Sequence, residues 1–112
     1  MKSKRLQGPD ELRAAVKNWA ATIKTRPRQI RIQQMTRKWA SCSSKGRVTF
    51  NSELFDQPYR FQEFVIVHEL LHLKIPNHGK LFKSLLKAYL PQRYYGSRGK
   101  GKRARSIFTA RV

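Results

Sequence analysis

Two histidines, His68 and His72, stand four residues apart in the sequence, and Glu69 directly follows the first of them. On a helix, residues i and i+4 lie on the same face, so both imidazoles can direct a nitrogen at one metal ion. Glu69 would then lie close enough to the ion to hold a water molecule and take its proton. The spacing therefore predicts a zinc site of the hydrolytic kind, carried on a helix.

The third ligand of such a site must come from the chain after Glu69. This part of the sequence contains no Asp or Glu, and His78 is its only histidine after His72. Pro76 disfavours helix at the residue before it, and Asn77 tolerates the left-handed backbone that a reversal needs. We therefore expect the chain to turn back and present His78. Three neutral imidazoles leave a fourth position for water, as in a catalytic zinc site.

Two simpler interpretations compete with a metal site. His68 and His72 would be core residues satisfied by hydrogen bonds, and His78 would be a histidine exposed in a loop. The context favours the metal site, because the segment is apolar almost all round and three polar side chains would be costly in a buried helix. The apolar residues are Phe61, Phe64, Val65, Ile66, Val67, Leu70, Leu71, Leu73 and Ile75.

The composition describes a small and strongly cationic chain. Its 112 residues contain 25 Lys and Arg against six Asp and Glu, a net charge of +19. This charge makes nucleic acid a candidate partner through a basic surface, although charge that serves only solubility is the competing interpretation. No apolar run approaches the length of a membrane span, no signal-peptide pattern opens the sequence, and Cys42 is the only cysteine. We therefore expect a cytoplasmic protein with no membrane association.

The order of elements predicts a single α+β domain over residues 1–95. Residues 96–112 form a basic tail, for which we expect flexibility, and its last residues would be able to fold back and limit access to the zinc. The pattern predicts an N-terminal helix, a small antiparallel sheet of three strands, the metal-binding helix and a C-terminal helix. Their expected ranges are 9–25 for the first helix, 29–35, 38–41 and 47–50 for the strands, and 59–75 and 79–90 for the last two helices.

Several motifs in order resemble those of the YgjP-like metal-dependent hydrolases. They are Trp39-Ala40-Ser41-Cys42-Ser43, Gly46-Arg47-Val48, Asn51 with Leu54, Val67 to Leu73, and Asn77-His78-Gly79 with Phe82. This family is similar in architecture to SprT-like and WLM proteases and to the small soluble minigluzincins. The sequence departs from the family pattern at Ala40, where glycine is usual, and at Lys83, where an aromatic residue is usual.

The resemblance implies a compact zincin-like fold, in which the sheet lies over the metal-binding helix and its outer strand holds an extended peptide. It also implies His68, His72 and His78 as zinc ligands and Glu69 as the general base. We expect Trp39 to support the helix and Cys42 to lie beside the site, although both are also ordinary core residues. Sequence order alone makes Arg93, Tyr94 and Tyr95 candidates for stabilising an oxyanion.

Three functions are consistent with these residues. The first is a zinc-dependent metallopeptidase that acts on a peptide or protein substrate. The second is a nucleotide or phosphoester hydrolase that uses the same zinc ion. The third is a non-catalytic nucleic-acid-binding module in which zinc only stabilises the fold.

Overall fold

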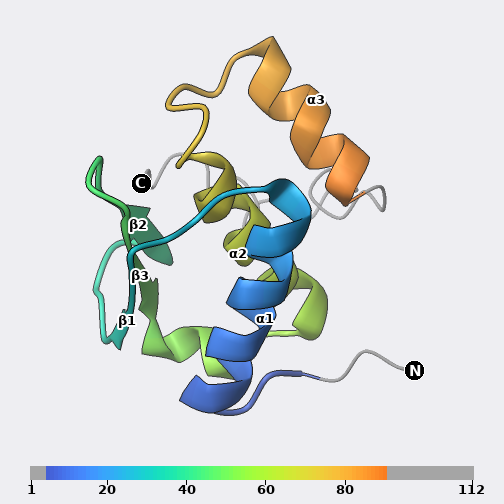
Figure 1. Cartoon of the computed structure of the whole chain (residues 1–112). Coiled ribbons are helices and arrows are strands. Elements are labelled where there is room, and N and C mark those ends of the chain that lie inside the picture. The colour runs from blue at the N-terminus through green and yellow to red at the C-terminus, as the bar shows by residue number, and fades with distance from the viewer. Residues whose placement is uncertain (1–4, 91–112) are drawn as a thin grey trace.

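The computed structural model of the chain describes residues 5–90 and contains three α-helices, one 3-10 helix and three strands in that range (Figure 1). In chain order these are α1 (Pro9–Ile23), β1 (Gln29–Gln33), β2 (Ala40–Cys42), β3 (Arg47–Asn51), the 3-10 helix η1 (Ser52–Asp56), α2 (Tyr59–Leu71) and α3 (Lys80–Tyr89). The predicted α+β class is confirmed. No helix in the described part of the chain is both long enough and apolar enough to cross a bilayer.

The sheet is mixed, and the prediction of an antiparallel sheet is wrong in this respect. The strand order is β1-β3-β2, with β3 antiparallel to β2 and parallel to β1. The central strand β3 is the most buried of the three, with four of its five residues buried and Val48 and Phe50 at its core. β2 and β3 form an antiparallel hairpin, whereas β1 joins the other side of β3 and runs in the same direction as β3.

Asn51, which is buried, explains why the first two strands differ from their predicted bounds. Its amide Nδ2 donates hydrogen bonds to the carbonyls of Met35, at 3.0 Å, and Lys38, at 2.9 Å. These carbonyls are therefore turned away from the strand ladders, so β1 ends at Gln33 and β2 begins only at Ala40. The Asn51 side chain fixes the connection that leads into β2.

α1 begins with Pro9, which suits the first turn of a helix because the ring removes an amide that would have no partner there. Its buried stripe is Leu12, Val16, Ala20 and Ile23. The helix ends at Lys24, which has a left-handed backbone conformation with a φ of 68°. The Thr25 amide then donates to the Ala20 carbonyl at 2.9 Å and closes the last turn.

α2 is the central element of the core. Every residue from Phe64 to Leu71 is buried, and the helix contacts α1, α3 and β2. At its first turn, the buried Gln62 accepts a hydrogen bond from the Leu6 amide and donates to the carbonyls of Leu6 and Leu54. The helix that carries the His-Glu pair is therefore held on all sides, which fixes the direction of its side chains.

Candidate metal centre

The last turn of α2 carries the first two polar residues of the predicted site. His68 and Glu69 are almost fully buried, with exposed fractions of 1% and 3%. His72 caps the helix with helical backbone angles, and its amide donates to the Glu69 carbonyl at 3.1 Å. The helical geometry therefore extends through residue 72, so His68 and His72 lie on one face as the spacing predicts.

After His72 the chain tightens and turns. The amides of Leu73 and Lys74 donate to carbonyls three residues earlier, at 3.0 and 2.9 Å, which ends the helix before the predicted Ile75. Lys74 also donates from Nζ to the Ile23 carbonyl at 3.1 Å. The side chain of Lys74 thus attaches the turn to the C-terminal end of α1, where a cation is favoured by the helix dipole.

The reversal to His78 uses the side chain of Asn77, and our expectation of a left-handed backbone at Asn77 is wrong. The only non-glycine residue with a positive φ in the described part of the chain is Lys24. Instead, Asn77 Oδ1 accepts a hydrogen bond from the Gly79 amide at 3.1 Å. This local turn holds His78 between Asn77 and the start of α3.

The structure brings His68, His72 and His78 together, and with Glu69 we call these residues the histidine centre. One ring nitrogen from each histidine lies within 4.8 Å of the others. His72 Nε2 and His78 Nε2 are only 2.9 Å apart. The three rings meet with centroid distances of 4.9, 5.1 and 4.6 Å for the pairs 68–72, 68–78 and 72–78.

Phe82 on α3 forms the wall behind these rings. Its centroid lies 5.3 Å from that of His68, 4.7 Å from that of His72 and 4.9 Å from that of His78. The Phe82 side chain is fully buried. An apolar wall excludes water from one side of the histidine centre and limits the rotation of all three imidazoles.

The donor set fits a zinc ion. Ligand nitrogens in a tetrahedral zinc site lie about 3.3 Å apart, given Zn–N bonds of about 2.0–2.1 Å, and small side-chain shifts would bring the three nitrogens to this separation. His72 Nδ1 lies 3.3 Å from the Ile75 carbonyl, which can only accept a hydrogen bond. Nδ1 therefore carries the proton in neutral His72, which leaves Nε2 as the ligand nitrogen.

Glu69 contacts His68, and one oxygen of its carboxylate has no hydrogen-bond donor among the described residues. Its Oε2 is 3.1 Å from Nδ1 of His68, whereas its Oε1 is buried and accepts no hydrogen bond from the described residues. A buried carboxylate oxygen is costly unless a donor meets it. Oε1 belongs to the carboxylate that contacts His68, so it is suited to accept a hydrogen bond from a water molecule at the centre.

β2 lies beside the centre. Trp39, just before the strand, packs edge-on against Phe61 of α2 with centroids 5.1 Å apart, as expected for a residue that supports the helix. Burial, and secondarily the negative charge of Glu69, raises the pKa of the Cys42 thiol to about 11. Cys42 is close enough to sense the Glu69 charge but does not belong to the group of possible metal ligands.

Sequence reasoning assigned no role to Lys74 and Phe82, which hold the centre, or to Asn51, which fixes the connection into the neighbouring strand β2. Lys74 and Asn51 act on carbonyls far along the chain, and no local pattern reports such contacts. Phe82 could have been recognised from local sequence, because it lies on the apolar face of the amphipathic helix α3, four residues after His78. Our expectations for Arg93, Tyr94 and Tyr95, and for the tail from residue 96, lie outside the described residues.

Comparisons with known proteins identify the family and the fold. The YgjP-like metallopeptidase domain matches residues 2–98. The metallopeptidase zymogen jannalysin of Methanocaldococcus jannaschii has a similar structure, with a TM-score of 0.64 and 24% identity over 84% of this chain and 89% of its own. The zymogen abylysin of Pyrococcus abyssi also has a TM-score of 0.64, with 21% identity over 71% of this chain and 80% of its own.

These two likenesses show the fold, and the family match covers most of the chain. No curated protein matches it. The motifs around Trp39, Asn51 and His68 to His78, which suggested the resemblance, all lie inside the matched range. The chain therefore belongs to the YgjP-like metallopeptidase family.

Proposed function

We propose that the protein is a zinc-dependent peptidase, with His68, His72 and His78 as the ligands of one catalytic zinc ion. The observation that carries this proposal is the approach of one nitrogen from each histidine to within 4.8 Å, beside a buried glutamate. When bound, zinc supplies Lewis-acid polarisation of the substrate carbonyl and of the attacking water. Neutral imidazole ligands leave most of the positive charge of the ion available for this role.

Glu69 acts as the general base in this proposal. Its Oε1 accepts a proton from the attacking water as the water oxygen bonds to the peptide carbonyl carbon. The carboxylic acid then gives this proton to the amine nitrogen as the carbon–nitrogen bond breaks. Burial of the Glu69 carboxylate keeps competing water away from the proton.

The exposed edge of β2 is the proposed place for the substrate backbone. β2 pairs with β3 on one side only within the described residues, and it contacts α2. An extended peptide can add to such an edge through main-chain hydrogen bonds. These bonds select for an extended chain and not for particular side chains, so we expect an unfolded protein segment or a peptide as the substrate.

The test is cleavage of an unfolded protein by the full chain after loading with zinc. We expect new peptide ends to form with wild-type protein and not with Glu69→Gln, which retains the zinc ligands. The same protein is incubated with nucleoside triphosphates to examine the phosphoester alternative. Release of phosphate or pyrophosphate without peptide cleavage would refute the peptidase proposal, and equal activity in the Glu69→Gln variant would refute the role of the base.

Three further predictions from the sequence stay predictions. Latency caused by the tail is tested by deletion of residues 97–112, since unchanged activity would exclude it. The cytoplasmic location is tested by fractionation of cells. Nucleic acid as a partner rests on the net charge of +19 and is no part of the peptidase proposal.

A further inference from the structure

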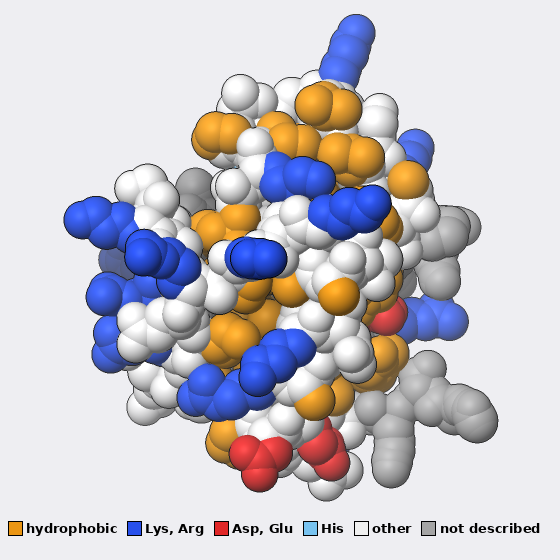
Figure 2. All heavy atoms as spheres, in the orientation of Figure 1, with side chains coloured by type: hydrophobic (Ala, Val, Ile, Leu, Met, Phe, Trp, Pro, Cys, Tyr) orange, Lys and Arg blue, Asp and Glu red, His pale blue; other side chains and the backbone are white. Residues whose placement is uncertain are grey.

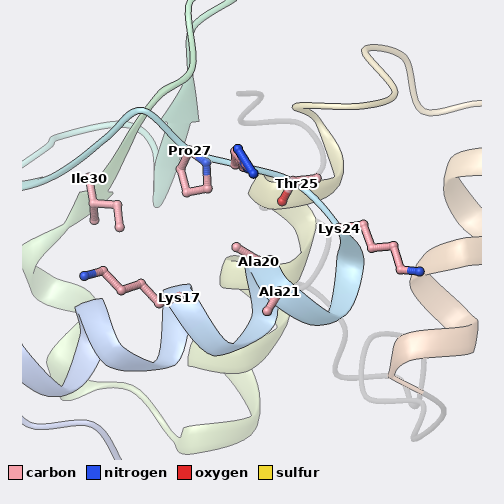
Figure 3. A pocket seen from close by; sticks show the side chains of 8 residues that line it. Lys17, Ala20, Ala21, Lys24, Thr25, Pro27 and Ile30 are labelled. Atoms are coloured by element: carbon pink, nitrogen blue, oxygen red, sulfur yellow. The ribbon is translucent and has the colours of Figure 1, made fainter.

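A second concave region lies away from the histidine centre, where the end of α1 meets β1. It is a cleft of about 660 Å³. Its lining residues, which we call the cationic cleft, are Lys17, Ala20, Ala21, Lys24, Thr25, Arg26, Pro27 and Ile30 (Figure 3). The floor is apolar and small, and the three charged residues among the lining are all cations.

The acidic residues of the chain are separated from this cleft. All six lie within the described residues: Asp10, Glu11, Glu53, Asp56, Glu63 and Glu69. Two of them stand in the first turn of α1, at the opposite end of the helix, and the other four belong to η1 and α2. Figure 2 shows Lys and Arg side chains around an apolar hollow, with acidic side chains near the lower and right-hand edges. The cleft is thus a region of unbalanced positive charge.

The three cations are exposed and are not used in ion pairs within the described structure. Lys17, Lys24 and Arg26 form no ion pair with any acidic residue among residues 5–90. Figure 3 shows Lys17 reaching beneath Ile30 at one end of the cleft, while the Lys24 side chain at the other end extends outward from the end of α1, away from Ile30. Cations at separate ends of one hollow suit an extended polyanion better than a single small anion.

The helix dipole alone does not account for this charge. Lys74 already donates a charged hydrogen bond to the Ile23 carbonyl at the end of α1. Lys17 stands before the last turn of the helix and Arg26 stands beyond it, so neither is placed to cap its final carbonyls. The cationic cleft therefore has more positive charge than the end of the helix requires.

Lys24 occupies a backbone conformation that glycine accepts more easily. Its φ of 68° lies in the left-handed region, where glycine is favoured at the end of a helix because it has no Cβ. The chain uses glycine at Gly46, where φ is 91°. A lysine at the left-handed position thus lowers stability and places a cation at the cleft, as expected if the charge has a use.

We propose that the cationic cleft binds the phosphodiester backbone of single-stranded nucleic acid. A recessed surface admits one strand, whereas reading a duplex requires a helix or ribbon that protrudes into a groove. The floor of Ala20, Ala21, Pro27 and Ile30 offers no aromatic ring for stacking with a base. We therefore expect binding through phosphate and sugar, with little selectivity for sequence. This inference does not depend on the proposed peptidase activity.

The test compares two triple variants of the full chain that each lose three of the positive charges. The cleft variant is Lys17→Gln with Lys24→Gln and Arg26→Gln. The matched control is Lys80→Gln with Lys83→Gln and Lys87→Gln, which removes three exposed lysines from α3. Fluorescence anisotropy of a labelled oligothymidylate measures affinity over a series of salt concentrations, and far-ultraviolet circular dichroism verifies that both variants are folded.

We expect the cleft variant to lose about tenfold or more in affinity at moderate salt, and the control to lose less than about threefold. The slope of log affinity against log salt should fall by about 2 in the cleft variant, at about 0.7 for each lost phosphate contact. Equal losses of affinity in both variants would overturn the proposal, because the net charge of the protein, and not the position of the three cations, would then determine binding. No binding by the wild-type protein would also overturn it.

Two competing ligands examine the class of partner. Polyglutamate and a duplex of matched length are added to the complex of wild-type protein with the oligothymidylate. We expect both to compete less well than unlabelled oligothymidylate at the same concentration of charge. Stronger competition by polyglutamate would make an acidic protein the partner and overturn the proposal. Stronger competition by the duplex would overturn the assignment to a single strand.

Discussion

The histidine centre and the cationic cleft differ in how their residues are held. In the centre, His68 and Glu69 are buried on a helix that is surrounded by core, and His72 and His78 follow within a few residues. In the cleft, the three charged residues are exposed and extend from a helix, its cap and a connection. Metal chemistry requires fixed geometry, which burial provides, whereas attraction of a polyanion requires only charge and shape.

The replacement Glu69→Gln should produce the largest effect. It keeps the size of the side chain but removes the base, so we expect peptide cleavage to fall by about 10²–10⁴-fold. Zinc content should not change, because Glu69 is not a proposed ligand. Elemental analysis and a peptide-cleavage assay on the same preparation provide both measurements. A variant that keeps its zinc and its full cleavage rate would contradict the role that we give to Glu69.

The replacement His78→Ala tests the part of the centre that comes from outside α2. Loss of one of three ligands should weaken zinc binding by at least about 100-fold, more than the loss of an outer hydrogen-bond partner. Competition with a chromogenic chelator measures the affinity. Asn77→Ala is a useful companion, because it removes only the turn hydrogen bond to Gly79 and should have a smaller effect. Unchanged affinity in His78→Ala would remove this residue from the site.

Cys42 reports the burial of the region beside the centre. Its pKa of about 11 lies above the ordinary value of 9.0, so at pH 8 the thiolate should be about 100-fold less populated than in an exposed cysteine. Alkylation of the metal-free protein should be slower by a similar factor. The control is Ser44→Cys in a Cys42→Ser background, which places a thiol in the exposed hairpin turn.

The raised pKa of the Cys42 thiol also makes the stability of the protein depend on pH. The folded protein holds the thiol proton more tightly than the unfolded chain, so the contribution of Cys42 to stability is lost as pH rises from about 9 to 11. The Cys42→Ser variant should lack this part of the pH dependence.

The alkylation experiment can also contradict the burial of Cys42. Rapid alkylation of Cys42, at the rate found for the turn thiol of the control variant, would show that the Cys42 thiol is not shielded.

Lys74 connects the two regions, because it joins the turn of the centre to the end of α1. The replacement Lys74→Met should weaken zinc binding only severalfold, less than the about tenfold expected for a direct partner of a ligand. It should also lower the free energy of unfolding by about 1 kcal/mol, through loss of a charged hydrogen bond at a helix end. Lys17→Met removes an equal charge from α1 and should leave zinc affinity unchanged. Equal zinc affinities in both variants would show that Lys74 does not position the turn.

The replacement Lys24→Gly should produce the smallest effect. In contrast to Lys74→Met, it should make the protein more stable. Relief of the left-handed strain should raise the free energy of unfolding by about 0.5–1 kcal/mol, measured by urea denaturation. Lys24→Gln keeps the strain and should not stabilise the protein. Both variants should bind oligothymidylate more weakly than wild type. If Lys24→Gly were the less stable protein, strain at this position would not explain the choice of lysine.

The two regions also differ in how well the sequence predicts them. His68, His72 and His78 lie within eleven residues, so helical spacing and one turn were enough to predict their approach. The cationic cleft has no motif, because its charge depends on where α1 ends and on how β1 returns past it. The net charge of +19 can be counted from the residues, but the sequence does not predict where on the surface this charge is concentrated.

The fold shows the same division between local and distant interactions. The start of α2 at Tyr59 and the start of β1 at Gln29 followed from local sequence patterns. The parallel pairing of β1 with β3 did not, since it depends on which strand takes the centre of the sheet. The ends of β1 and β2 depend on the side chain of Asn51, whose contacts with Met35 and Lys38 join separate segments.

The zinc content of the purified full chain tests the central claim most directly. Elemental analysis of wild-type protein should find one zinc ion per chain after loading and removal of free metal. The double variant His68→Ala with His72→Ala should contain none, with circular dichroism as the control for folding. A wild-type protein that takes up no zinc, or a folded double variant that holds as much zinc as wild type, would contradict the account.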